Sequence, residues 1–127
     1  IHAIRRSPEV QAFSTWAPPE GVLGALCDAA RERAAGLRAR QGELERTARD
    51  AGSVPGFAAA LRRDTVAVIG EVKRRSPSKG DIAPGLSAAE QSAAYARGGA
   101  AALSILTEPT RFGGSEADVR AARTATR

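Results

Sequence analysis

Two short apolar runs, each followed by a polar loop and a helical pattern, constrain the fold of this chain more than any other feature. The first run covers residues 65–70 and the second covers residues 100–106. The first is rich in β-branched residues and does not alternate with polar ones, which is typical of a strand buried on both faces of a parallel sheet. Strands that alternate with helices imply parallel pairing through right-handed crossovers. We therefore expect an α/β fold.

Two parallel strands are too few for a stable sheet, because each strand needs neighbours and a helical cover. The expected fold is a (β/α)8 TIM barrel, which needs about 250 residues. A chain of 127 residues would hold only its N-terminal part, residues 22–127. We expect a helical preface over 22–63, the first two β/α units over 64–127, and an extension or linker over 1–21.

The ends of the sequence suggest that it is a piece of a longer protein. It contains no Met and begins with Ile1, so we expect an N-terminal segment to be missing. Its last helical pattern, which follows Ser115, is expected to continue to Arg127.

Apolar residues at helical spacing define the expected helices. The pattern from Val22 to about Ala48 predicts one long amphipathic helix, interrupted only by Gly36 and Gly42. A short helix is expected over residues 57–63. Its inward residues should be Phe57, Ala60 and Leu61.

Capping signals mark the two later helices. Ser87 with Glu90, and Ser115 with Asp118, each have the spacing of an N-terminal cap. The earlier of these helices should end at Gly98-Gly99, where a left-handed residue is easily accommodated.

Composition limits the possible functions. Hydrophobic residues make up 43% of the chain but lean on Ala, and aromatic residues are only 4%, so the core should be thin. The net charge of +5 suits anionic ligands, although the charge taken alone favours a solvated basic surface. No apolar run approaches the roughly 20 residues of a membrane span, and no signal peptide is visible.

Several kinds of site are excluded by residue counts. Cys27 is the only cysteine, so an internal disulfide cannot form, and a reducing cytoplasm fits. Its place on an apolar helix face favours packing over reactivity. His2 is the only histidine, which makes a zinc site or a histidine-assisted nucleophile implausible. Glycine-rich nucleotide-binding motifs are also missing.

The candidate catalytic residues are Glu71 and Lys73, directly after the first apolar run. Side chains two residues apart on a strand point to the same side, so both should project from the ligand-binding end of a parallel barrel. A carboxylate and an ammonium placed together there could tune each other's protonation and contact an anionic substrate. An exposed ion pair at the end of a strand is the competing interpretation.

The loops that follow the two strands hold the other candidates. Ser76 and Ser78 flank Pro77 and can donate hydrogen bonds to a carboxylate or phosphate, or simply belong to a solvated turn. A third interpretation makes residues 73–79 a basic patch for nucleic acid, although the position directly after a buried strand counts against it. Phe112 could stack on an aromatic ligand or cover the barrel rim.

Four sequence blocks resemble the indole-3-glycerol-phosphate synthase family. They are VIGEVKRRSPSKG at 68–80, YARGGA at 95–100, LSILTE at 103–108 and FGGS at 112–115. Their order and spacing match the family over about residues 22–127. Two small departures are Gly70, where Ala is usual, and Thr110-Arg111 before the ring of Phe112.

The resemblance implies an enzyme of tryptophan biosynthesis, a carboxy-lyase that closes the indole ring of a phosphorylated small molecule. No cofactor or metal is implied, and neither nucleic acid nor membrane is an expected partner. Lys73 would contact the substrate and assist acid chemistry, with Glu71 handling protons or orienting it. Ser76 and Pro77 would line the substrate site, and Phe112 would help to form the pocket for the aromatic ring.

The resemblance also implies what this chain lacks. The family takes its general-acid lysine from a third strand and further ligands from later ones, so the C-terminal half of the barrel is needed and this fragment alone is expected to be inactive. Two alternatives remain open, namely another phosphate-binding barrel enzyme and a non-catalytic basic binding protein. The expected location is the cytoplasm.

Overall fold

The computed structural model describes Ala17 and residues 19–126. The chain divides into two compact units, one that ends at Gly52 and one that begins at Ser53. Most of the expected extension over residues 1–21 lies outside the described residues.

The first unit contains two helices where the sequence predicted one. Helix α1 spans Val22–Arg38 and helix α2 spans Gln41–Asp50. The chain breaks at Ala39 and Arg40, not at a glycine. Arg40 leaves the helical conformation, and its guanidinium binds both carboxylate oxygens of Glu43 at 3.0 and 3.1 Å, which secures the start of α2. The single long helix is therefore a wrong prediction.

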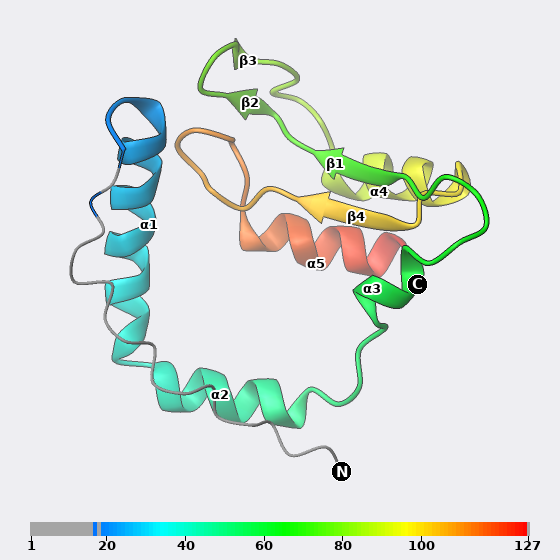
Figure 1. The fold of residues 1–127 in the computed structure, drawn as a ribbon, viewed down its shortest axis with the longest axis horizontal. Coiled ribbons are helices and arrows are strands. Elements are labelled where there is room, and N and C mark those ends of the chain that lie inside the picture. The colour runs from blue at the N-terminus through cyan, green and yellow to red at the C-terminus, as the bar shows by residue number, and fades with distance from the viewer. Residues whose placement is uncertain (1–16, 18, 127) are drawn as a thin grey trace. The chain divides into compact units, whose positions relative to one another are not determined.

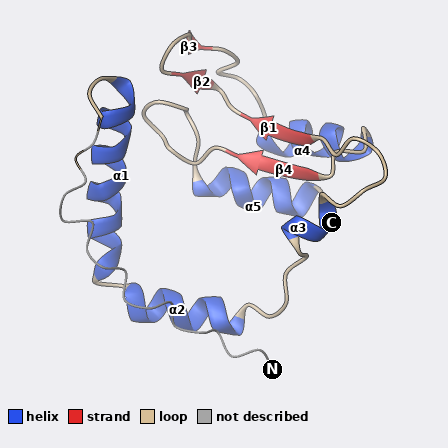
Figure 2. Cartoon of the chain, viewed as in Figure 1, coloured by secondary structure: helices blue, strands red, loops and turns tan. Residues whose placement is uncertain are grey.

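The second unit is built from two β/α repeats, as expected (Figure 1). After the short helix α3 (Phe57–Ala60), strand β1 (Ile69–Val72) leads through a loop to helix α4 (Ala88–Arg97). Strand β4 (Ala102–Ile105) follows, and helix α5 (Glu116–Ala125) ends the described part. Strands β1 and β4 pair in parallel, with Ile69 opposite Ala102 and Val72 opposite Ile105. Figure 2 shows helices α4 and α5 next to this small sheet.

The first strand begins later than predicted. Residues 65–68 do not form a regular strand, and β1 includes Glu71. The reason is the position of the partner strand: the turn at Gly98-Gly99 ends only just before Ala101, whose N–H donates to the Val68 carbonyl at 2.8 Å. Residues before Val68 therefore have no strand opposite them in the part of the chain that the structure describes.

Only one face of β1 is buried in the described residues. Gly70 and Val72 point towards the helices, and an added Cβ on Gly70 would lie 2.6 Å from the Tyr95 ring. Ile69 is 46% exposed on the other face, and Val66 is 85% exposed. The prediction of burial on both faces is thus wrong for this structure, because helices α4 and α5 cover one face only.

The core is thin, as the composition predicted. Its buried hydrophobic members among the described residues are Val72, Ala88 and Ala122, and the buried polar member is Ser92. Small side chains on α4 and α5 let the two helices pack closely together against the sheet.

The predicted helix caps are confirmed. Ser87 accepts a hydrogen bond from the Glu90 N–H, and Ser115 accepts one from the Asp118 N–H. Gly99 adopts a left-handed φ of 83° after α4.

The predicted ends of two helices are wrong. Helix α5 ends at Ala125, because Thr126 leaves the helical conformation, and Arg127 lies outside the described residues. Helix α3 ends at Ala60, and Phe57 is 59% exposed, not inward. No helix among the described residues is long and apolar enough to cross a membrane.

Candidate active site

Glu71 and Lys73 lie together at the C-terminal end of β1, as their spacing predicted. Lys73 Nζ is 2.6 Å from Glu71 Oε1. The two side chains are 33% and 44% exposed respectively, so the pair is open to a ligand. Glu71 pairs with Ser104 of β4 in the strand register, and the carbonyl of Glu71 accepts a hydrogen bond from the Tyr95 hydroxyl at 3.2 Å.

The polar loop after β1 is a small hairpin, which the sequence analysis did not predict. Strand β2 (Arg75–Ser76) pairs antiparallel with strand β3 (Gly80–Asp81). Gly80 has a φ of 67°, a conformation that favours glycine at the end of the tight turn. Ser76 Oγ accepts a hydrogen bond from the Lys79 N–H at 3.1 Å. Ser76 and Pro77 are half-buried in this hairpin.

Glu108 organises the loop after β4. Its carboxylate accepts hydrogen bonds from Thr110 Oγ1 and from the N–H groups of Arg111 and Phe112. Desolvation raises the pKa of Glu108, but these hydrogen bonds outweigh it and lower the pKa to about 2. The turn fixes the backbone of Phe112, which is half-buried. Sequence reasoning missed this role, because the side chains that usually mark turns are those of Asn, Asp and Ser, and not Glu.

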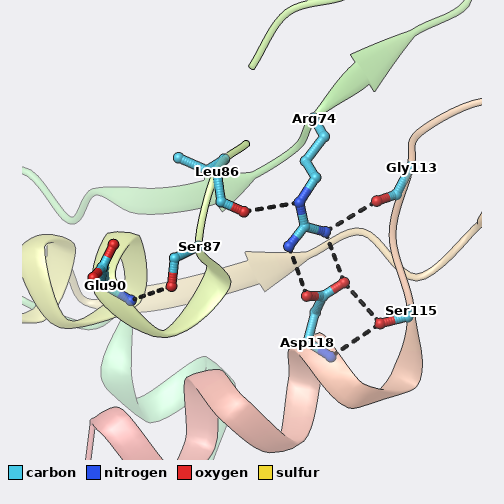
Figure 3. Close-up of polar contacts among 7 residues, drawn as sticks. All are labelled: Arg74, Leu86, Ser87, Glu90, Gly113, Ser115 and Asp118. Carbon is cyan, nitrogen blue, oxygen red and sulfur yellow. Dashed lines mark hydrogen bonds and ion pairs between the residues drawn. The ribbon is translucent and has the colours of Figure 1, made fainter. Parts of the chain in front are cut away.

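Arg74 ties the two loops to helix α5 (Figure 3). Its guanidinium forms a bidentate pair with Asp118, with both N···O distances 2.8 Å. It also donates to the carbonyls of Leu86 at 2.8 Å and Gly113 at 3.0 Å. Ser115 Oγ donates to the same Asp118 carboxylate at 2.9 Å. Four N–H groups of one side chain therefore hold the start of α4, the loop after β4 and the start of α5.

This ion pair is more buried than the Lys73–Glu71 and Arg75–Asp81 pairs near the same strand ends. The Arg74 and Asp118 side chains are only 19% and 14% exposed. The hydrogen bond from Arg74 lowers the pKa of Asp118 to about 2, against opposing desolvation. The capping position of Asp118 was predicted, but its pairing with Arg74, 44 residues away, had no local signal in the sequence.

The hairpin and the loop after β4 enclose a polar pocket of about 270 Å³. Its walls include the predicted residues Ser76 and Pro77, together with Arg75, Gly80, Thr110 and Arg111. Backbone contact joins the two loops, because the Arg75 N–H donates to the Phe112 carbonyl at 3.2 Å. Glu71 and Lys73 contact each other and are not in the lining of this pocket.

The basic stretch over residues 73–79 is not a row of free cations. Lys73 pairs with Glu71, Arg74 with Asp118 and Arg75 with Asp81. A nucleic-acid surface needs cations that are available to phosphates, so the ion pairing argues against that interpretation. No group of three or more His, Cys, Asp or Glu side chains in the described part of the chain could hold a metal ion.

The sequence that forms these strands and loops matches a known protein family. The sequence profile of the family described as "Indole-3-glycerol phosphate synthase" matches residues 23–127, which include both strands and both loops. The chain belongs to the indole-3-glycerol phosphate synthase family. The resemblance noted from the four sequence blocks is thereby confirmed.

Several relatives named indole-3-glycerol phosphate synthase match this chain over part of their length. The protein from Parafrankia sp. (strain EAN1pec) is 46% identical over 108 residues, which is 84% of this chain and 37% of the relative. The Hyphomonas neptunium protein is 50% identical over 88 residues, 66% of this chain and 33% of the relative. The Nocardioides sp. protein is 66% identical over 58 residues, 46% of this chain and 22% of the relative. The chain thus spans well under half the length of these synthases.

Proposed function

We propose that the protein containing this chain catalyses the indole-3-glycerol-phosphate synthase reaction of tryptophan biosynthesis. In this reaction, 1-(2-carboxyphenylamino)-1-deoxyribulose 5-phosphate closes its indole ring and loses one carbon dioxide and one water. The observation that carries the proposal is the Lys73–Glu71 contact at the C-terminal end of β1, in a chain of this family. The two β/α repeats are, in this proposal, the first two of a (β/α)8 barrel.

Lys73 would contact the substrate and assist the acid steps of this reaction, in which the family takes its general-acid lysine from a third strand. An ammonium has three N–H donors, and one contact to Glu71 leaves others for a substrate oxygen. A donor is needed as the ring carbon attacks the ketone carbon, because negative charge develops on the ketone oxygen. A donor is needed again when the resulting hydroxyl leaves as water. Glu71 would hold Lys73 in place and accept protons as they are released.

The two loops would supply binding contacts. Ser76 and Pro77 would line the substrate site from the hairpin, where Pro77 restricts the backbone and Ser76 offers a hydroxyl. Phe112 would form part of the pocket for the aromatic ring of the substrate, because its backbone is fixed by Glu108 and Arg75. The reaction involves no net oxidation or reduction, and the proposal includes no cofactor. A cytoplasmic location belongs to the same proposal.

The two alternatives fit the observations less well. Another phosphate-binding barrel enzyme would not be expected to share the family profile over residues 23–127. A non-catalytic basic protein would need free cations on the loop after β1, and three of the basic residues there are paired.

The experiment is a ring-closure assay on the natural gene product that contains this sequence. Product formation is followed by indole absorbance and mass, and carbon dioxide release is measured in parallel. We expect equal amounts of both products from the gene product and none from the isolated 127 residues, because the family draws further catalytic groups from later strands. Absence of ring closure by the gene product would contradict the proposed function.

A further inference from the structure

Helix α4 contacts the candidate catalytic pair through the side chain of Tyr95. This residue lies near the C-terminal end of α4, and the helix packs beside β1 (Figure 1). The Tyr95 hydroxyl donates a hydrogen bond to the Glu71 carbonyl at 3.2 Å. The Glu71 carboxylate in turn contacts Lys73 Nζ at 2.6 Å. A residue of α4 is therefore bonded to the main chain of the pair.

The position of the Tyr95 ring depends on the glycine at position 70. A Cβ added to Gly70 would lie 2.6 Å from Cδ2 of Tyr95, 2.7 Å from its Cγ and 3.1 Å from its Cβ. The Cβ and Cγ atoms are close to the helix backbone, so they cannot swing away as the far end of a flexible side chain can. The bare main chain of Gly70 thus lets the ring lie directly against β1, where its hydroxyl reaches the carbonyl of the next residue.

The main chain that carries the ring is also held in place. The Tyr95 carbonyl accepts a hydrogen bond from the Ala100 N–H at 3.0 Å, in the turn that leads to β4. The next residue, Ala101, donates its N–H to the Val68 carbonyl at 2.8 Å, directly before β1. The helix end and the strand are therefore tied to each other, so the Tyr95 hydroxyl is presented to Glu71 by a fixed backbone.

The hydrogen bond acts where a fixed orientation matters most. Strand β1 ends at Val72, and Lys73 follows beyond its regular pairing with β4. The Glu71 carbonyl belongs to the peptide plane between Glu71 and Val72, and rotation of this plane would redirect the side chains on both sides of it. A displacement of about 1 Å at a reacting group can slow a reaction about 100-fold.

We propose that Tyr95 is a positioning residue, whose hydroxyl holds the end of β1 in the orientation that directs Lys73 to the substrate. The inference rests on the proposed function for the reaction that Lys73 assists. Tyr95 acts through the main chain of Glu71 and donates no proton to the substrate. Loss of its hydroxyl should therefore slow the chemical steps and leave substrate binding nearly unchanged.

The first test compares Tyr95→Phe with the control Ser92→Ala in the natural gene product. Tyr95→Phe removes the hydroxyl and keeps the ring. Ser92 lies on the same helix and is fully buried, and its hydroxyl has no hydrogen-bond partner among the described residues. We expect Tyr95→Phe to lower kcat for ring closure about fivefold, as for one neutral hydrogen bond, with KM within about twofold of the wild type. Ser92→Ala should keep the kcat of the wild type.

A purely structural role for Tyr95 predicts a different result. Glu71 is exposed and Tyr95 is half-buried, so water can replace the hydroxyl at the Glu71 carbonyl. The midpoint of urea unfolding should therefore be the same for Tyr95→Phe and the wild type. An unchanged kcat in Tyr95→Phe, or a lower kcat together with a lower urea midpoint, would overturn the inference.

NMR of the gene product with isotope-labelled lysine gives a readout that does not need activity. The Cε signal of Lys73, assigned by its loss in Lys73→Met, should shift in Tyr95→Phe and stay in place in Ser92→Ala. The Lys79 signal should not move in either variant. This result in a gene product without ring-closure activity would uphold the positioning of Lys73 by Tyr95 while the proposed function fails. A Lys73 signal that does not move in Tyr95→Phe would overturn the inference, whatever the activity.

Discussion

The helical unit that ends at Gly52 and the β/α unit that begins at Ser53 are held by different kinds of contact. In α2, the side-chain hydrogen bonds join residues three or four positions apart, as between Gln41 and Glu45. In the β/α unit, one side chain joins positions 44 residues apart, from Arg74 to Asp118. Every residue of α2 is exposed, whereas the Arg74–Asp118 pair is largely buried.

This difference has a consequence for function. Contacts within one or two helical turns follow from the local sequence and stabilise a helix by a few tenths of a kcal/mol each. The long-range contacts of the β/α unit instead set the positions of the loops that hold Ser76 and Phe112. Substitutions of the same type should therefore have different effects in the two units.

The largest contrast is expected for glycine substitution. An added Cβ on Gly114 would lie 1.8 Å from the Leu106 carbonyl oxygen, and backbone atoms cannot yield as a side chain can. Gly114→Ala should lower the free energy of unfolding of the natural gene product by at least about 3 kcal/mol. An added Cβ on Gly36 of α1 meets nothing within 4 Å, so Gly36→Ala should stabilise the helix by about 0.5–1 kcal/mol. The midpoint of urea unfolding measures the stability of each variant. Equal midpoints for Gly114→Ala and Gly36→Ala would contradict the expected difference between the two units.

The next effect concerns the long-range ion pair. Arg74→Met leaves the Asp118 carboxylate without its bidentate partner and removes the contacts to Leu86 and Gly113. We expect a loss of about 2–3 kcal/mol, somewhat less than for a fully buried pair. The matched control is Arg120→Met in α5, which removes an exposed pair with Glu116 and should cost less than about 0.5 kcal/mol. A similar loss of stability in both variants would show that the buried pair contributes no more to folding than the exposed pair does.

The smallest effect is a pH dependence. The pKa of Asp118 is about 2 in the folded protein, lowered first by the hydrogen bond from Arg74, and that of Glu108 is also about 2. Both values lie below those of unfolded chains, so the stabilisation is present above about pH 4 and is lost as the pH falls towards 2. Asp118→Asn should flatten the stability profile in this range. Glu43 in α2 also has a lowered pKa because of Arg40, but it is exposed, so Glu43→Gln should leave the profile unchanged.

The parts of the fold that the sequence predicted depend on local signals. Ser87 with Glu90, and Ser115 with Asp118, cap helices as their three-residue spacing indicated. The two-residue spacing of Glu71 and Lys73 correctly placed both side chains on one side of the strand.

The parts that the sequence did not predict depend on distant partners. The start of β1 is set by where β4 begins, more than thirty residues later. The Arg74–Asp118 pair and the contact between Arg75 and Thr110 likewise join segments with no shared pattern. The break at Arg40 is local, but it arises from a side-chain contact to Glu43 that the apolar periodicity does not reflect.

The central proposal is that the Lys73–Glu71 pair at the end of β1 takes part in the ring-closure chemistry proposed for the protein that contains this chain. The most direct measurement compares kcat/KM for ring closure in Lys73→Met and Lys79→Met variants of the natural gene product. Both substitutions remove one lysine charge from the same loop region, but Lys79 is exposed in the hairpin and does not contact Glu71. Because Lys73 is proposed to contact the substrate and assist the acid steps, we expect kcat/KM to fall at least about 100-fold in Lys73→Met, with Lys79→Met close to the wild type. Similar values for the two variants would contradict the account.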